Sequence, residues 1–297
     1  MKIRRAVIPA AGLGTRHFPA SQALKKELFP VVGPDGITRA LLHYHVLELL
    51  EAGIEEIAVI TQPGSEVEFA RYFAAPAADY LKKLEKHPDL AREAAMLGAA
   101  GDHIRYVVQH TQEGYGHAVY QARDFAAGET VLLVLGDHLF RSRGRSCSSR
   151  MIEIAAAAPH RSISAVNRIG PQDLRGYGTI AGRRLAGNPQ MIEVSAIVEK
   201  PEIGLARSRL RVDGLREDEF LGWFGMHALT PSIFEILAEM IRDGVRDGGE
   251  FQLTRAQEIQ RSREGYLAYE MTAARRYDFG TPQDYLDSLS AFARPGI

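Results

Sequence analysis

The sequence holds a single cysteine, Cys147, among 297 residues. No disulfide can form within the chain, and no zinc site built from several cysteines can exist. The 36 lysines and arginines are balanced by 37 aspartates and glutamates, which leaves a net charge of −1. This balance provides no global positive field that would attract nucleic acid or anionic lipid. We therefore expect a cytoplasmic protein that binds neither nucleic acid nor membrane.

Long apolar runs are missing as well. The longest candidate, residues 131–135, falls far short of the roughly 18 apolar residues that a membrane span requires. The first 14 residues imitate a signal peptide, but Pro9 interrupts them and Arg16 and His17 end the apolar stretch. We find no repeat, linker or low-complexity tract, and this favours one continuous domain over residues 1–297. Cys147 lies in a polar stretch, where we expect an exposed and inert thiol.

Short apolar runs alternate with helical patterns in the first half of the chain, and this order is typical of an α/β protein with a doubly wound, mainly parallel sheet and helices on both faces. Alternating strands in the second half predict an added antiparallel part. The expected strands are 3–8, 54–61, 104–109, 130–135, 162–167, 191–198, 220–229 and 266–270. The expected helices are 38–52, 79–98 with a break at His87-Pro88, 117–125, 231–241, 252–261 and 282–292.

A glycine-rich loop follows the first expected strand, at the sheet edge where α/β proteins bind ligands. Gly12 and Gly14 allow a ligand to approach the backbone closely, and Arg16 and Lys26 add the cations that a polyphosphate needs. The fingerprint of NAD-binding Rossmann proteins is absent, because His17 replaces its third glycine and no acid lies about 20 residues further on. The alternative interpretation is a glycine turn beside solvated bases.

Two aspartates follow the ends of expected strands. Asp137 comes directly after strand 130–135, and Asp278 occupies a similar position near the end of the chain. Two such carboxylates could share one Mg²⁺ bound to substrate phosphates. Asp278 could instead cap the helix that starts at Pro282. Glu199 and Lys200 end another strand, where they could contact hydroxyls and a phosphate or form a surface ion pair.

In their order along the chain, these segments resemble the sugar-nucleotidyltransferase family, and within it most closely the bacterial UTP:glucose-1-phosphate uridylyltransferases, also called UDP-glucose pyrophosphorylases. The similarity covers almost the whole sequence. The segments that carry it are 9–16, 26–27, Gln109 with 114–119, 135–137, 176–178, 198–201, 248–254 and 277–280.

The resemblance implies the fold of nucleotide-diphospho-sugar transferases, UTP and a sugar-1-phosphate as substrates, and a homo-oligomer. It implies a role for each matching residue: Ala11, Gly12, Gly14, Thr15, Glu27, Gln109 and Gly114 bind the nucleotide, Arg16 and Lys26 hold the triphosphate, Gly178 and Glu199 contact the hexose, Lys200 binds the sugar phosphate, and Asp137 and Asp278 bind Mg²⁺. Catalysis would then depend on Arg16, Lys26, Asp137 and Lys200.

Some positions depart from the usual pattern of these uridylyltransferases. Gln22 replaces a lysine, His138 replaces a second aspartate, Arg255 replaces an aspartate, and Met226-His227 replaces Arg-Tyr. A thymidylyltransferase, a uridylyltransferase for another sugar, and a nucleotide-sugar sensor without turnover therefore remain as alternatives.

Overall fold

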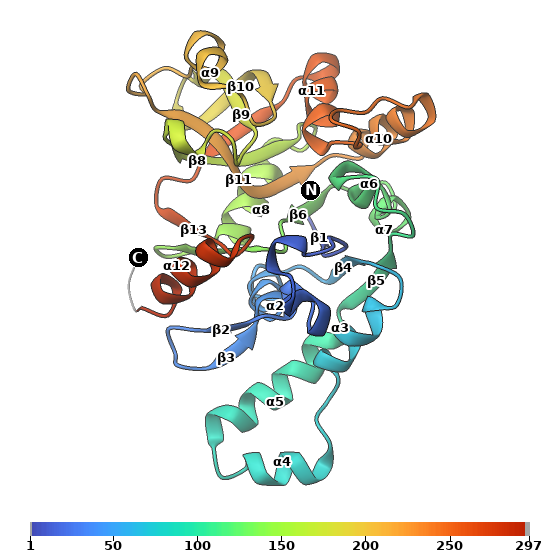
Figure 1. Ribbon diagram of the computed structural model, residues 1–297. Coiled ribbons are helices and arrows are strands. Elements are labelled where there is room, and N and C mark those ends of the chain that lie inside the picture. The colour runs from blue at the N-terminus through green and yellow to red at the C-terminus, as the bar shows by residue number, and fades with distance from the viewer. Residues whose placement is uncertain (1, 295–297) are drawn as a thin grey trace.

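The computed structural model describes residues 2–294, and a nine-stranded mixed sheet runs through it (Figure 1). The strand order is β5-β4-β1-β6-β11-β8-β12-β10-β9. These strands are β1 (Arg5–Pro9), β4 (Glu56–Thr61), β5 (Ile104–Val108), β6 (Val131–Val134), β8 (Ile163–Ile169), β9 (Thr179–Leu185), β10 (Asn188–Val198), β11 (Phe220–Leu229) and β12 (Leu267–Glu270). Two ribbons accompany the sheet, β2 (Pro30–Val32) with β3 (Thr38–Ala40) and β7 (His138–Ser142) with β13 (Ala274–Asp278).

The first four strands of this order, β5 to β6, are parallel. Their side chains are apolar on both faces because each face is covered. In β1, Ala6 and Ile8 enter one core together with Leu42 and Val46, whereas Val7 enters a second core with Phe234. The parallel half places the carboxyl ends of β1 and β6 side by side, and the loops that follow these two strands carry the expected ligand-binding residues.

The second half of the sheet is mainly antiparallel, and this confirms the expected mixed architecture. β11 pairs antiparallel with β6 on one side and with β8 on the other. Between Trp223 and His227 its register against β8 shifts, and Gly225 adopts a positive φ of 104° there. This irregularity turns the strand where it passes below the candidate site.

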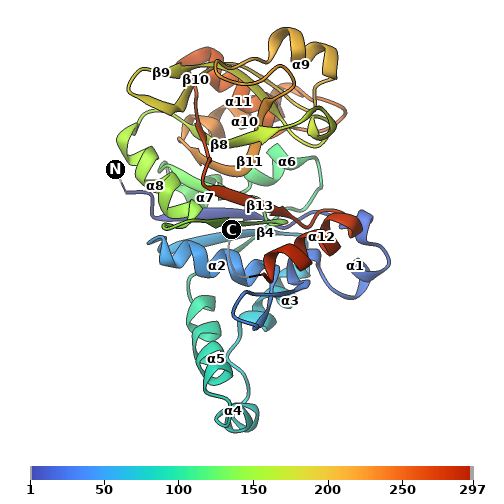
Figure 2. The same cartoon turned by 90° about the vertical axis from the view of Figure 1, so that its left-hand side faces the viewer.

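The helices lie on both faces of the sheet, and one pair projects from the body (Figures 1 and 2). They are α1 (Ala20–Ala23), α2 (Leu41–Glu51), α3 (Ser65–Phe73), α4 (Ala78–Leu84), α5 (Pro88–Gly101), α6 (Tyr115–Tyr120), α7 (Arg123–Ala126), α8 (Cys147–Ala157), α9 (Ile203–Arg209), α10 (Ser232–Asp243), α11 (Leu253–Glu264) and α12 (Pro282–Phe292). The projecting pair is α4 and α5, and the expected break at His87-Pro88 separates them. None of the helices within residues 2–294 is long and apolar enough to cross a membrane.

Three local expectations are wrong. The expected helix 117–125 is two helices, α6 and α7, separated by a turn at residues 121–122. Residues 38–40 form strand β3 and not the start of a helix, because they pair with β2. Cys147 is 1% exposed and not a surface thiol, since the first turn of α8 packs it into the core. Its polar neighbours in sequence misled the prediction, because Ser148 is buried with it and donates its backbone N–H to Glu48 (2.9 Å).

Candidate active site

The loop after β1 forms one wall of a cavity of about 390 Å³. The opposite walls come from the loop after β6 and from the loop between β5 and α6. Gly136 has no room for a side chain, since a Cβ there would lie 2.8 Å from the carbonyl oxygen of Pro9. The predicted nucleotide residues that line this cavity are Ala11, Gly12, Thr15, Lys26, Glu27, Gln109 and Gly114, together with Asp137.

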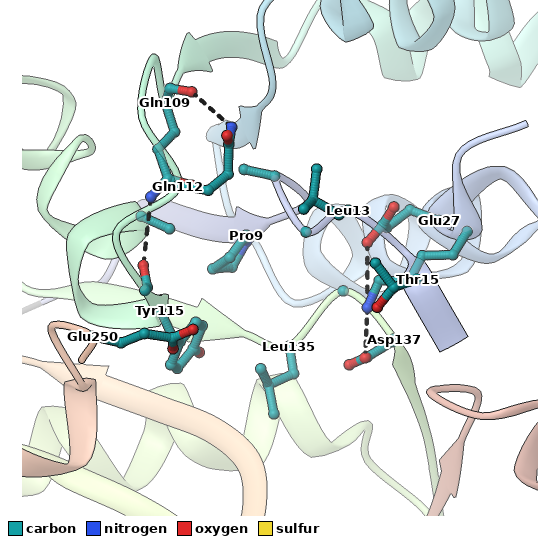
Figure 3. A pocket seen from close by; sticks show the side chains of 16 residues that line it. Pro9, Leu13, Thr15, Glu27, Gln109, Gln112, Tyr115, Leu135, Asp137 and Glu250 are labelled. Atoms are coloured by element: carbon teal, nitrogen blue, oxygen red, sulfur yellow. Dashed lines mark hydrogen bonds and ion pairs between the residues drawn. The ribbon is translucent and has the colours of Figure 1, made fainter. Parts of the chain in front are cut away.

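The cavity has two chemically different ends. Figure 3 shows Gln109 and Gln112 at one end, Glu27, Thr15 and Asp137 at the other, and Pro9 between them. The Gln109 amide donates to the carbonyl of Gly114 (3.4 Å) and contacts His117 (3.0 Å), so its orientation is fixed. One end therefore offers amide groups suited to a base, and the other offers charges suited to phosphates.

Lys26 is the centre of the charged end. Its Nζ lies 2.7 Å from Asp137 Oδ2 and 3.7 Å from Glu27 Oε1. Burial alone would lower the pKa of Lys26, but the carboxylates of Asp137 and Glu27 raise it well above its usual range. Burial likewise opposes the ionised form of Asp137, but Lys26 outweighs burial and lowers the pKa of this carboxyl to about 2. Both groups are charged at neutral pH.

Glu27 has a different environment. It is 1% exposed, and neither of its carboxylate oxygens has a hydrogen-bond partner within residues 2–294. Burial raises its pKa to about 7, even though Lys26 acts in the opposite direction. A buried acceptor without a donor is costly, so Glu27 is suited to receive hydroxyl hydrogens from a ligand in this cavity.

A second cavity, of about 450 Å³, lies on the other side of Asp137. Both cavities share four lining residues, Tyr115, Leu135, Asp137 and Glu250. The predicted sugar, phosphate and metal residues Gly178, Glu199, Lys200 and Asp278 all line the second cavity, and so does Arg16. Two ligands could therefore meet next to Asp137.

Asp278 is the last residue of strand β13. This strand pairs with β7, which begins directly after Asp137. It accepts hydrogen bonds from the Tyr177 hydroxyl (2.9 Å) and the Gly280 backbone N–H (2.8 Å), and His138 Nε2 lies 3.2 Å away. Burial opposes ionisation here too, but these contacts hold the pKa of Asp278 far below its usual range. The alternative that Asp278 caps the next helix is wrong, because Thr281 caps α12 by accepting from the backbone N–H of Asp284 (3.2 Å).

The two aspartates are close to each other. A Cβ placed on Gly280 would lie 3.0 Å from Asp278 Oδ1 and 3.4 Å from Asp137 Oδ2. Two ionised carboxylates fit a hard divalent cation that takes its other ligands from phosphate oxygens and water. Within residues 2–294, no group of three or more acidic, histidine or cysteine side chains could hold a metal ion alone.

The sequence-based set omits several lining residues and includes one that lies elsewhere. Gly14 lines neither cavity; with a φ of 66° it allows the turn into the short 3-10 helix Thr15–His17. Trp223 faces the second cavity, although nothing in its sequence position marks it, and Tyr177 faces it too, from the matched family segment 176–178. Tyr115 and Glu250 lie in matched family segments, which could have suggested them. Gln22 and Arg255 line neither cavity, whereas His138 and His227 line the second.

Comparisons with known proteins identify the family of this chain. The family model described as "Nucleotidyl transferase" matches residues 5–294. A UTP–glucose-1-phosphate uridylyltransferase of Staphylococcus epidermidis is 31% identical over 98% of this chain and 93% of the relative. Two solved structures, a UDP-glucose pyrophosphorylase complexed with UDP-glucose and a UTP-bound UGPase from Acinetobacter baumannii, superpose with TM-scores of 0.78 and 0.77 at 26% identity. They cover 98% of this chain, and this chain covers 98% and 93% of them. The chain belongs to the nucleotidyl transferase family.

Proposed function

We propose that this protein transfers the uridylyl group of UTP to glucose-1-phosphate, forming UDP-glucose and pyrophosphate, with Mg²⁺ as its cofactor. The observation that carries the proposal is the junction of the two cavities at Asp137, with Lys26 on one side and Asp278 on the other. The names of its relatives supply the substrates. Its composition favours the cytoplasm as its location.

In this proposal the first cavity binds UTP. The base lies at the end formed by Gln109 and Gly114, and Glu27 accepts hydrogen bonds from ribose hydroxyls. The phosphates lie at the end where Lys26 and Thr15 are located. The sugar-1-phosphate binds in the second cavity, with its ring near Gly178 and Glu199 and its phosphate near Lys200 and Arg16.

The reaction then requires alignment and charge neutralisation. A phosphate oxygen of the sugar-1-phosphate attacks the α-phosphorus of UTP, and the bond from this phosphorus to the bridging oxygen of pyrophosphate breaks. The attacking phosphate is already an anion, so no general base is needed. Lys26, Arg16 and Lys200 reduce the repulsion between the two anionic substrates. Magnesium held by Asp137 and Asp278 would stabilise the charge that develops on the phosphates.

The test is pyrophosphate release with Mg²⁺ across a grid of nucleotides and sugar-1-phosphates. The nucleotides are UTP, dTTP, CTP, ATP and GTP; the sugars are the 1-phosphates of glucose, galactose and N-acetylglucosamine. Maximal release with UTP and glucose-1-phosphate supports the proposal. Maximal release with dTTP would instead identify a thymidylyltransferase, and a different sugar would correct the acceptor alone. Tight UDP-glucose binding in calorimetry without turnover would identify a sensor.

The variant Asp137→Ala tests the role of this carboxylate at the junction of the two cavities. We expect kcat to fall by at least about a hundredfold, since the variant loses a carboxylate next to the reacting phosphates. Asp243→Ala is the matched control, because Asp243 is exposed at the end of α10 and, among residues 2–294, forms an ion pair with Arg242 alone. Full activity of Asp137→Ala would contradict the role proposed for this residue.

A further inference from the structure

Two hydrogen-bond donors in the wall of the second cavity have no acceptor among the described residues. The indole Nε1 of Trp223 and the hydroxyl oxygen of Tyr115 are both buried, and neither has a hydrogen-bond partner within residues 2–294. Both residues line the second cavity. Buried donors without partners are uncommon because each loses its hydrogen bonds to water on burial. Their position in one cavity points to a ligand that supplies the acceptors.

The indole of Trp223 packs directly against residue 178, and this close contact is possible because residue 178 is glycine. A Cβ at this position would lie 2.6 Å from Trp223 Nε1 and 3.0 Å from Glu199 Oε2. The ring is held by Tyr266 and by His227, whose ring centres lie 6.3 Å and 5.5 Å away. The indole therefore has a fixed orientation in the wall of the cavity, where its buried N–H group lies against Gly178, next to the carboxylate of Glu199.

His227 supplies a further donor on the same face of β11. Gln257 Nε2 donates to His227 Nδ1 (3.1 Å), and the Ser164 hydroxyl lies 2.6 Å from the same nitrogen. An amide nitrogen can only donate, so Nδ1 is the acceptor and the ring proton is on Nε2. Burial lowers the pKa of His227 to about 3, and the ring is therefore neutral. Nε2 has no hydrogen-bond partner in the described part of the chain, while the ring lines the cavity.

Glu199 is an acceptor in the wall of the same cavity. Glu199 Oε2 accepts a hydrogen bond from Thr254 (2.6 Å), and Glu199 Oε1 lies 3.7 Å from Lys200 Nζ. Trp223 can only donate, and His227 in this tautomer has only a donor left. A hydroxyl can accept from one of these groups and donate to Glu199 at the same time. A ring that carries several hydroxyls satisfies this set of groups, whereas a deoxygenated ring leaves donors unpaired.

We propose that Trp223, His227 and Tyr115 determine the sugar specificity by donating hydrogen bonds to hydroxyl oxygens of the hexose. This inference rests on the function proposed above. It assigns to His227, which occupies a position that departs from the usual pattern, a direct contact with the substrate. Trp223 and His227 line only the second cavity, so their contacts concern the sugar, whereas Tyr115 lies where the two cavities meet.

The first test uses the unmodified protein. KM and kcat are measured for glucose-1-phosphate and for its 2-, 3-, 4- and 6-deoxy analogues at saturating UTP. We expect kcat/KM to fall by about tenfold or more for at least one analogue, since a donor loses its acceptor. Equal kcat/KM for all four analogues and the parent sugar would overturn the inference. Absence of turnover with every sugar-1-phosphate would contradict the proposed function instead.

Variants then assign the contacts. Trp223→Phe and Tyr115→Phe remove a donor and keep the ring, and Tyr269→Phe is the matched control because the Tyr269 hydroxyl bonds to Gln190 outside the cavity. His227→Asn keeps an acceptor for Gln257 and removes the cavity donor, whereas His227→Gln restores a donor near Nε2. We expect a roughly tenfold higher KM for glucose-1-phosphate in the first two variants and in His227→Asn. The KM for UTP should stay unchanged in the Trp223 and His227 variants, which lie outside the first cavity, and His227→Gln should recover part of the loss.

A binding readout separates recognition from turnover. Trp223 is the only tryptophan of the chain, so its fluorescence reports on ligands in this cavity. We expect UDP-glucose to change the emission and UDP alone to change it far less. In Tyr115→Phe and His227→Asn the UDP-glucose titration should shift to roughly tenfold higher concentrations. Unchanged titrations and unchanged KM values in all folded variants would overturn the assignment.

Discussion

Single glycines determine where the two cavities are open. Gly178→Ala would place a methyl group 2.6 Å from the Trp223 indole and 3.0 Å from Glu199, where a shift is required. Such overpacking costs about 1–3 kcal/mol. We expect the KM for the sugar-1-phosphate to rise roughly tenfold to a hundredfold, with the KM for UTP unchanged, in steady-state assays.

Gly204→Ala is the control for this substitution. A Cβ on Gly204 has no neighbour within 4 Å, and the residue lies in helix α9. Alanine should therefore be tolerated there without change in either KM. An unchanged KM for the sugar in Gly178→Ala would show that the sugar does not use this wall.

The pH dependence of folding stability tests the effect of burying Glu48. Burial raises the pKa of Glu48 to about 7 in the folded protein, although the Ser148 backbone N–H that it accepts acts in the opposite direction. The unfolded chain loses this proton near pH 4.5, so folding stability decreases as the pH rises from 4.5 to 7. Glu48→Gln should remove this decrease and raise the free energy of unfolding at pH 8 by about 1–2 kcal/mol in urea denaturation.

Below pH 4.5, Glu48→Gln and the parent should be equally stable, because the carboxyl is then protonated in both states. Glu85→Gln, at an exposed position at the end of α4 and away from Glu48, is the control. Equal stability of Glu48→Gln and the parent at pH 8 would mean that the burial of Glu48 does not destabilise the folded protein.

At the scale of elements, the ribbon β7–β13 brings together Asp137 and Asp278, the pair proposed to bind Mg²⁺. It joins His138 to Asp278 across 140 residues of chain, and Arg276 of β13 donates to the carbonyl of Trp223 (2.6 Å). The end-of-strand position of each aspartate could be read from the sequence, because a buried apolar run precedes Asp137. Their proximity could not be derived from local patterns, since the pairing of distant strands depends on the whole fold; the family resemblance alone implied it.

The sequence likewise did not predict which aromatic residues line the second cavity. Trp223 lies within a strand whose side chains are buried on both faces, so periodicity does not separate the cavity face from the core face. The shift in register next to Gly225 decides which side chains reach the cavity. Bulges of this kind depend on the neighbouring strands, and the sequence therefore predicted the strand bounds of β11 without its irregularity.

The projecting helix α5 is fastened to the ribbon β2–β3 by Arg39. This side chain is 8% exposed and donates to both carboxylate oxygens of Glu93 (2.5 and 2.6 Å) and to Asp35 (2.8 Å). Arg39→Ala leaves a half-buried carboxylate without its partner, and we expect a loss of about 3 kcal/mol in stability. Hydrogen exchange should accelerate in residues 78–101, and activity should remain near that of the parent.

Arg92→Ala serves as the control for Arg39→Ala, because Arg92 is exposed on the same helix. If hydrogen exchange in residues 78–101 is the same in Arg39→Ala and in the parent, the contact to Glu93 does not hold the helix in place.

For the whole molecule, we propose assembly into a homo-oligomer. Several large apolar side chains are exposed on the projecting helices and on α3, namely Val67, Tyr80, Leu90 and Met96. An apolar cavity of about 550 Å³ lies between α2 and α5. Sedimentation velocity should give a mass that is a multiple of 32.8 kDa. A single species of 32.8 kDa at micromolar concentration would contradict this expectation.

The ion pair between Lys26 and Asp137 has a consequence for the order of events. Without ligands, each of these groups is the counterion of the other, at 2.7 Å. A free divalent cation must compete with an ammonium group for Asp137, whereas a nucleotide that brings its own cation offers Lys26 a phosphate in exchange. If Asp137 binds Mg²⁺ as proposed, the empty protein would discriminate against bare metal ions, and the arrival of the nucleotide would release the carboxylate for the cation.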